Sequence, residues 1–194
     1  MEFLIDLISA NNNLPLKSIN KFKNLFSIQN VKKKHVLAKI GETPTDFFIL
    51  KKGIVRSFFL DKKGREVIQS LSVPKSSTGA FPALILNKPS RSSYDCLTDC
   101  ELYVADFSEF KKLAQKDHHI SILYHKALEL NYIKMEERIF ELAMLNATEL
   151  YLKVQKELPG IEKQIPQYQI ASYLNVTPVQ LSRIRKDLSL IKVS

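Results

Sequence analysis

Residues 167–186 read QYQIASYLNVTPVQLSRIRK, and this stretch decides how the rest of the chain is interpreted. Its spacing predicts two short helices joined by a tight turn. Asn175 lies at the predicted corner, and Asn is one of the few non-glycine residues that tolerate a left-handed backbone. Small Ala171 would let the two helices approach closely. Apolar residues occur where crossing helices must touch: Ile170, Leu174, Val176, Leu181 and Ile184.

The start of the second helix carries a clear capping signal. Thr177 is a good N-cap residue, and Pro178 suits the first helical position. Gln180 lies three residues after Thr177, which is the spacing of a capping box. The second helix is therefore predicted to begin at Pro178, and Pro166 suits the first turn of the helix before it.

The other face of the second helix is polar and basic. A helix-turn-helix needs an apolar underside for docking and a basic, hydrogen-bonding face for the major groove. Gln180, Ser182, Arg183, Arg185 and Lys186 supply such a face. The alternative is an ordinary pair of core helices whose polar face is merely solvated.

The composition of the whole chain agrees with a polyanionic partner. The chain has 194 residues, a formal net charge of +9 and a pI near 9.4. Such a charge favours nucleic acid or an anionic membrane surface. No stretch approaches the roughly 20 apolar residues that span a bilayer, so no membrane-spanning segment is predicted. Nucleic acid is the expected partner, and no membrane partner is expected.

The N-terminal segment and the two cysteines indicate a cytoplasmic protein. Glu2 and Asp6 stand where a signal peptide would carry positive charge, so secretion is not expected. Cys96 and Cys100 are too few for a disulfide framework or an iron–sulfur cluster and are interpreted as structural. No metal site is predicted, and no P-loop, GxSxG or HExxH motif indicates an enzyme.

The hydropathy pattern divides the chain into three parts. Residues 3–28 are helix-like with a break near Asn11–Pro15, and from Val31 short β-rich runs alternate with turn signals, which indicates an antiparallel unit. The sequence FFL-DKKG-REVI over 58–68 predicts a hairpin. Ser108 is a candidate cap for a short helix that follows the last strand.

A long helix is predicted from about Asp117 to Asn146, and another from Thr148 to Glu157. The long helix would extend about 45 Å and carries apolar residues on more than one side. One side could cover the β unit while another meets a second copy of the chain. A core helix within a single chain is the alternative.

Together these parts resemble the Crp/Fnr (cyclic-AMP receptor, or catabolite activator) superfamily of transcription regulators. The most similar segment is Ala171–Lys186, which looks like the version common in regulators of the Bacteroidetes. Residues 47–53 (FFILKKG) and 61–66 (DKKGRE) resemble the family's β-roll signature. Residues 146–151 (NATELY) resemble the start of its DNA-binding domain, although Leu150 replaces the usual Arg.

The resemblance implies an α+β fold with three parts. These are a β-roll sensor of the cyclic-nucleotide-binding, double-stranded jelly-roll type with N-terminal helices over 1–116, a long dimerisation helix over 117–146, and a winged-helix-like helix-turn-helix domain over 147–194. It implies a homodimer on a pseudo-palindromic site in double-stranded DNA, with RNA polymerase as a further partner. The alternative function is a small-ligand or cyclic-nucleotide binding module whose helix-turn-helix contacts a protein.

The resemblance also assigns roles to the DNA-binding residues. Gln167 and Thr177 would contact phosphates, Gln180 and Arg183 would face base edges, and Arg185 and Lys186 would lie near the DNA backbone, with Ser182 on the same face. Arg can donate to guanine and Gln can pair with adenine, which suits these roles. Two alternatives stay open: Gln180 could be occupied in the capping box, and Arg185 could pair with a carboxylate.

The cyclic-nucleotide cassette of the family is only half present. Members that bind cyclic nucleotides carry Gly-Glu and then Arg-Ser/Thr-Ala. Here the candidate pocket consists of Gly79, Ala80, Arg91 and Ser92, with one extra residue in the interval. Ala80 cannot accept a hydrogen bond from a ribose hydroxyl, so cyclic AMP is not expected as cofactor. Another small effector, a vestigial pocket, or a surface role for Arg91 stays open.

Overall fold

Two four-stranded antiparallel sheets form the N-terminal half of the protein. The computed structural model describes residues 14–191. The sheets have the strand orders β1-β8-β3-β6 and β2-β7-β4-β5. Side chains from both sheets form one shared cluster, which includes Leu50, Val55 and Leu102. The strands are β1 (Ser27–Val31), β2 (Val36–Ala38), β3 (Asp46–Lys52), β4 (Val55–Leu60), β5 (Glu66–Ser72), β6 (Ser77–Thr78), β7 (Ser93–Cys96) and β8 (Cys100–Asp106).

Helices cover one end of this β-roll. An aromatic cluster joins α2 (Leu16–Lys23), α4 (Phe107–Lys116) and the first turns of the long helix to β3 and β8. Within it the ring of Phe47 lies 5.1 Å from that of Phe110 and 5.5 Å from that of Phe26. Helix α3 (Phe81–Leu86) follows β6. The cluster fixes where the long helix starts.

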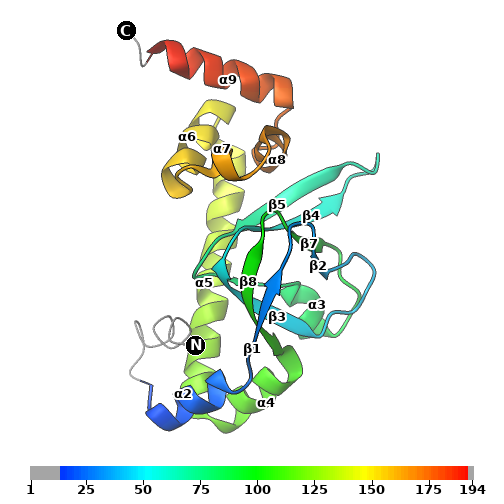
Figure 1. Ribbon diagram of the computed structural model, residues 1–194, viewed down its shortest axis with the longest axis vertical. Helices are drawn as coiled ribbons and strands as arrows, with labels where there is room; N and C mark the ends of the chain where they lie inside the picture. Colours follow the sequence, from blue (N-terminus) through cyan, green and yellow to red (C-terminus); the bar gives the residue numbers. More distant parts are fainter. Residues whose placement is uncertain (1–13, 192–194) are drawn as a thin grey trace.

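The long helix α5 (His118–Met144) runs along the molecule from this end to the C-terminal helices (Figure 1). Its first turn is capped by the carboxylate of Asp117, which accepts from the N–H of His119. Only Ile120 of α5 is fully buried. Many apolar side chains farther along the helix are exposed, including Ile133, Ile139 and Phe140.

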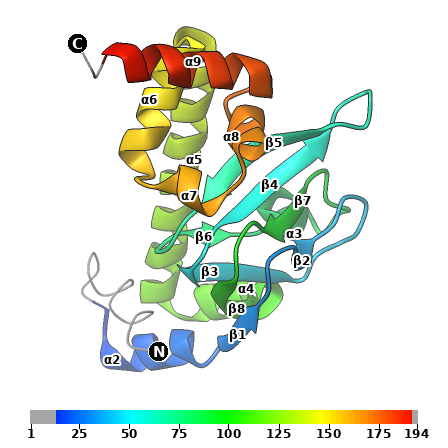
Figure 2. The same ribbon diagram turned by 45° about the horizontal axis from the view of Figure 1, so that its top comes forward.

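Four helices form the C-terminal unit: α6 (Ala147–Glu157), α7 (Ile161–Gln164), α8 (Gln167–Tyr173) and α9 (Pro178–Ile191). They share a core that includes Leu150, Ile170 and Leu181. Ile54 and Leu97 of the β-roll belong to the same core. In Figures 1 and 2 helix α8 lies beside the hairpin of β4 and β5, so the C-terminal unit packs directly on the β-roll.

The structure confirms several expectations from the sequence. The predicted hairpin is present, with Leu60 paired to Glu66, and the long helix follows within two residues of its predicted bounds. None of the helices in residues 14–191 is long and apolar enough to cross a membrane.

Other expectations were wrong in detail. Ser27 and Ile28 belong to β1 instead of a helix, because they pair with Val104 and Tyr103 of β8. The cap of α4 is Asp106, whose carboxylate accepts from the N–H of Glu109, while Ser108 donates to that same carboxylate. Helices α3 and α7 were not predicted. The helix-like pattern over 3–13 lies outside the described residues.

Candidate nucleic-acid interface

The turn between α8 and α9 has the predicted conformation. Asn175 has φ of +56°, which is the left-handed region. The N–H of Val176 then donates to the carbonyl of Ala171 at 3.0 Å and closes the turn. Ala171, Leu174 and Leu181 are almost completely buried beneath it. The turn therefore fixes the crossing of α8 and α9, as expected of a helix-turn-helix.

The start of α9 is held by the predicted capping box. The side-chain oxygen of Gln180 accepts from the N–H of Thr177 at 2.8 Å and from its hydroxyl at 3.0 Å. The hydroxyl of Thr177 accepts from the N–H of Gln180 at 3.2 Å. The oxygen of the Gln180 amide is thus occupied in the cap, which leaves its NH₂ group as the part that can still donate.

One face of α9 carries exposed side chains at helical spacing. Val179, Ser182, Arg183 and Lys186 are all exposed and follow the i, i+3, i+4, i+7 pattern of one helix side. Leu181 and Ile184 lie on the opposite side, toward the core of the unit. Val179 was not among the residues expected from the sequence to contact DNA.

Arg185 is placed differently from the other basic residues of α9. Its guanidinium lies 2.8 Å from the carboxylate of Glu162 in α7. The same carboxylate accepts from the hydroxyl of Tyr151 in α6. Burial of Tyr151 and its bond to Glu162 raise the pKa of that phenol to about 12. Arg185 therefore ties α9 to α6 and α7, which is the second of the two roles left open for it.

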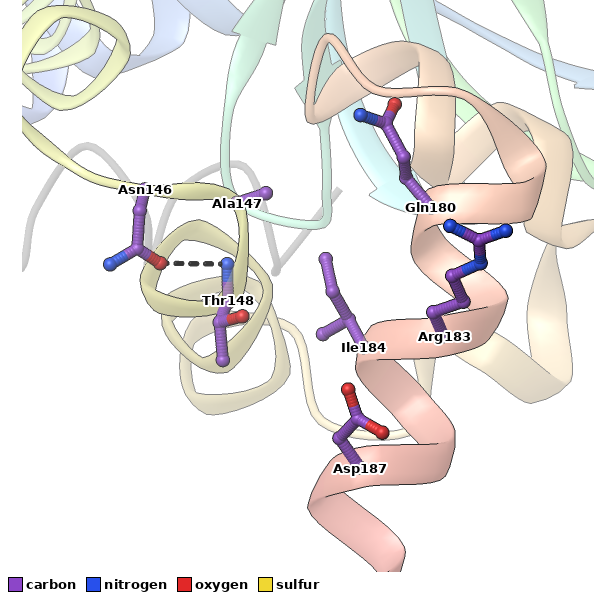
Figure 3. A pocket seen from close by; sticks show the side chains of 7 residues that line it. All are labelled: Asn146, Ala147, Thr148, Gln180, Arg183, Ile184 and Asp187. Carbon is purple, nitrogen blue, oxygen red and sulfur yellow. Dashed lines mark hydrogen bonds between the residues drawn. The ribbon is translucent and has the colours of Figure 1, made fainter.

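A groove of about 550 Å³ separates α9 from the start of α6 (Figure 3). The first turn of α6 forms one wall, with Asn146 as N-cap and Thr148 beside it. Ile184 and Asp187 point from α9 into the space between the helices, while Gln180 and Arg183 lie farther along the other wall. Gln167 is exposed at the first position of α8.

The exposed apolar residues of α5 form a continuous seam. Leu130, Ile133, Phe140 and Met144 are each between 49% and 67% exposed. With Glu137 between them, their spacing alternates between three and four residues, which is the pattern of a coiled-coil seam. Single exposed apolar residues are ordinary, whereas a stripe of this length favours a protein partner.

The four candidate pocket residues of the β-roll have separate surroundings. Gly79 has φ of +146°, and a Cβ there would lie 3.4 Å from the backbone of Phe47. Ala80 is buried in a small cluster with Ala38, Ala83 and Tyr94. Arg91 is exposed, and Ser92 donates from its hydroxyl to Gln69 at 3.4 Å. Within residues 14–191, no three His, Cys, Asp or Glu side chains are grouped to hold a metal.

Three further residues connect the C-terminal unit to the rest of the protein. Arg56 of β4 is buried and donates to Gln169 of α8, and Ser172 of α8 bonds to the backbone of β5. From the sequence alone Arg56 lies in a strand and Gln169 on a short helix, 113 residues apart. A buried arginine in an apolar strand is a signal that a partner must exist, but it does not identify that partner.

Comparisons with known proteins agree with this architecture. The family model of the cyclic nucleotide-binding domain matches residues 28–117. FixK2 from Bradyrhizobium japonicum superposes with a TM-score of 0.74 at 18% identity, over 86% of each chain. The c-di-GMP responsive global regulator CLP from Xanthomonas campestris gives a TM-score of 0.70 at 16% identity, over 92% of this chain and 93% of that one.

A third structure, described as a transcriptional regulator of the Crp/Fnr family from Eubacterium rectale, gives a TM-score of 0.71 at 14% identity. It covers 92% of this chain and 85% of the other. No curated protein sequence matches the chain. At these identities the superpositions establish the fold.

Proposed function

We propose that this chain, which carries a cyclic nucleotide-binding domain and has the fold of the Crp/Fnr regulators, is a DNA-binding transcription regulator that acts as a homodimer. The observation that carries the proposal is the exposed face of α9. Arg183 and Lys186 lie there beside Ser182 and Val179, opposite a buried apolar side. A helix of this kind, set on a tight turn, fits the major groove.

Each residue of this face has a specific role in the proposed complex. Arg183 would donate bidentately to a guanine edge, and Ser182 would donate or accept at a neighbouring base. Lys186 would neutralise a phosphate, and the hydroxyl of Thr148 across the groove would donate a hydrogen bond to another. Gln180 would contribute only its NH₂ group, because its oxygen is bound to Thr177. Arg185 would position α9 instead of contacting DNA.

The seam of α5 would join the two copies. Dimerisation through Leu130, Ile133, Phe140 and Met144 would bury their exposed side chains and bring the two α9 helices into a two-fold arrangement. Such a dimer would bind half-sites about 34 Å apart, one turn of the double helix. In this proposal the sensor spans residues 1–116, the dimerisation helix 117–146 and the DNA-binding domain 147–194. The regulator would act in the cytoplasm, with RNA polymerase as a further partner.

We propose further that cyclic AMP is not the effector. The glutamate that cyclic-nucleotide members use is replaced by Ala80, which is packed against Ala38, Ala83 and Tyr94. Burial raises the pKa of Tyr94, whose ring fills part of this region. Arg91 is exposed instead of lying against these residues. If the β-roll binds a small effector, its chemistry differs from the ribose–phosphate recognition of the family.

The experiment that tests DNA binding starts from a pool of random duplexes. The purified protein is used to select bound sequences, which we expect to contain two inverted half-sites. Arg183→Ala should abolish the preference for the selected sequence while leaving the thermal unfolding midpoint unchanged. Lys156→Ala, which removes one positive charge at an exposed position of α6, serves as the matched control. A pool that shows no enrichment would contradict the proposal and favour the ligand-binding alternative.

A further inference from the structure

The C-terminal unit rests on the outer face of the sheet β2-β7-β4-β5. Ile54, Leu71 and Leu97 pack against the core of helices α6, α8 and α9. Apolar contacts of this kind hold two surfaces together but do not specify their relative orientation, since the hydrophobic effect is non-directional. Directional polar contacts at the same interface can specify this orientation further.

Arg56 provides the most specific of these contacts. Its side chain is 8% exposed and makes two bonds to the carboxylate of Asp95 on β7, at 2.7 and 2.9 Å. Its Nη1 donates to Glu66 at 2.6 Å and to the side-chain oxygen of Gln169 at 2.9 Å. The guanidinium also lies 4.1 Å from the ring centre of Phe58.

Three of these partners belong to the β-roll, and Gln169 alone belongs to α8. Gln169 is itself 5% exposed, so its oxygen has been removed from water and depends on this bond. Because the guanidinium of Arg56 donates to both carboxylate oxygens of Asp95, it cannot rotate to follow a displaced partner. The position of Gln169 is consequently fixed relative to β4 and β7.

A second contact joins α8 to the edge of the sheet. Strand β5 ends the sheet order, so its outer backbone groups have no neighbouring strand. The hydroxyl of Ser172 accepts from the N–H of Ile68 and donates to the carbonyl of Glu66, both at 3.1 Å. Ser172 thus takes the place of a strand neighbour at this edge. Glu66 takes part in both contacts, through its carboxylate to Arg56 and through its backbone to Ser172.

The other side of α8 is held by the long helix. Arg138 of α5 donates to the backbone carbonyl of Tyr173, and its guanidinium lies 4.1 Å from the centre of that ring. It also pairs with Glu141 at 3.1 Å, and Glu141 pairs with Lys153 of α6 at 2.6 Å. Helix α8 is therefore fixed by one arginine from the β-roll and another from the proposed dimer helix.

We propose that Arg56, acting through Gln169, is a positioning residue that couples the hairpin of β4 and β5 to the orientation of the DNA-contacting helix α9. This inference rests on the proposed DNA-binding function. A displacement of the hairpin shifts Glu66, which moves both the Arg56–Gln169 and the Ser172 contacts. Because the turn at Asn175 fixes α9 on α8, the displacement reaches the recognition face. The β-roll controls α9 through this pair of contacts.

Hydrogen exchange at a single backbone amide tests the coupling without DNA. The N–H of Ile68 donates to the hydroxyl of Ser172, so it reports on α8 through a different hydrogen bond from that of Gln169. Gln169→Met removes the bond to Arg56 while keeping the length of the side chain. We expect exchange of the Ile68 amide to accelerate about tenfold in this variant, since one buried charge-assisted hydrogen bond is lost.

Gln164→Met is the matched control, because it makes the same chemical change at an exposed position of the same unit. Glu66→Gln weakens the ion pair between Arg56 and the half-exposed Glu66 of the hairpin. It serves as the second variant if Gln169→Met fails to fold. It should also accelerate exchange at Ile68. Exchange at Ile68 that is the same in the wild type and in these variants would overturn the coupling.

The second experiment measures the affinity for the duplex that the wild-type protein selects. Loss of the Arg56–Gln169 bond should change its affinity by about fivefold or more, whereas Gln164→Met should not change it. Equal affinity of Gln169→Met and wild type would contradict a positioning role. If the wild type itself binds no duplex, the proposed function fails, while the exchange result at Ile68 still decides whether the two parts are coupled.

Discussion

Arg56 and Gln169 are 113 residues apart in the sequence, yet the guanidinium of the first donates to the amide oxygen of the second at 2.9 Å in a buried interface. Burial alone would lower the pKa of Arg56, but its bonds to Asp95 and Glu66 raise it, so the arginine stays charged. This pair joins the β-roll to the unit that we propose contacts DNA. It adds directional hydrogen bonds to the apolar packing of this interface.

The first prediction concerns the stability that depends on this arginine. Arg56→Met should lower the free energy of unfolding by about 3 kcal/mol, because it leaves Asp95 and Gln169 without their buried partner. Urea unfolding monitored by circular dichroism measures the change. Arg65→Met, which breaks the exposed pair with Asp61, is the control and should cost much less. Equal costs for the two variants would show that the Arg56 contacts contribute little.

The second prediction concerns the junction of α2, α4 and α5 and its dependence on pH. The carboxylate of Asp117 accepts from Lys21 at 2.9 Å and from the hydroxyl of Ser18 at 3.0 Å. The Lys21 bond, opposed by desolvation and supported by Ser18, lowers the pKa of Asp117. A lowered pKa in the folded state contributes stability above the unfolded pKa, which is about 3.9, and this contribution is lost as pH falls through the folded value.

Asp117→Asn should therefore lose about 2 kcal/mol relative to wild type at neutral pH. The difference between the two proteins should shrink as the pH falls from about 4, the pKa of this carboxyl in the unfolded chain, through its lower value in the folded protein. Urea unfolding at a series of pH values provides the measurement. A difference that is constant from neutral to acidic pH would mean that the charge of Asp117 does not stabilise the fold.

The third prediction concerns the seam of α5. Phe140→Glu and Ile133→Glu should each convert a dimer into a monomer in sedimentation velocity, since a buried carboxylate pair would face its own copy across the two-fold axis. Lys134→Glu introduces the same side chain at an exposed position outside the seam and should leave the dimer intact. Dimers that survive both seam substitutions would place the contact between copies elsewhere.

The fourth prediction concerns Val179, which is 60% exposed on the same helix side as Arg183. An exposed apolar side chain at this point can contact the methyl group of thymine. Replacing one thymine per selected half-site by deoxyuridine should weaken wild-type binding about fourfold for each half-site, or about fifteenfold for the whole duplex, because one buried methyl is lost at each. Val179→Ala should be insensitive to the replacement. Wild-type binding that is unaffected at every thymine would remove Val179 from base selection.

Local signals in the sequence were sufficient to predict the helix-turn-helix. The cap at Thr177 and Gln180 and the left-handed Asn175 depend on residues within a few positions of each other, and both are present in the structure. The hairpin over 58–68 was predicted for the same reason. Strand β1 was assigned partly to a helix because its residues are stabilised by pairing with β8, which local propensity does not contain.

The contacts between the β-roll and the C-terminal unit could not be predicted from the sequence. Arg56 and Gln169 are each unremarkable in their local setting, and only the packing of α8 on the sheet brings them together. The role of Arg185 could not be predicted from the sequence either, because its position on the helix fits both a DNA contact and an internal ion pair. The carboxylate of Glu162, twenty-three positions earlier in the numbering, decides in favour of the ion pair.

The most direct test of the central claim is the salt dependence of binding to the selected duplex. We expect affinity to fall at least about 100-fold between about 50 and 200 mM salt, because bound Lys and Arg displace condensed counterions. Lys186→Ala should reduce the slope of log affinity against log salt by about two, one for each protomer. Affinity that does not change with salt would contradict DNA binding. A slope that stays the same in both Lys186→Ala and Arg183→Ala would contradict DNA binding through α9.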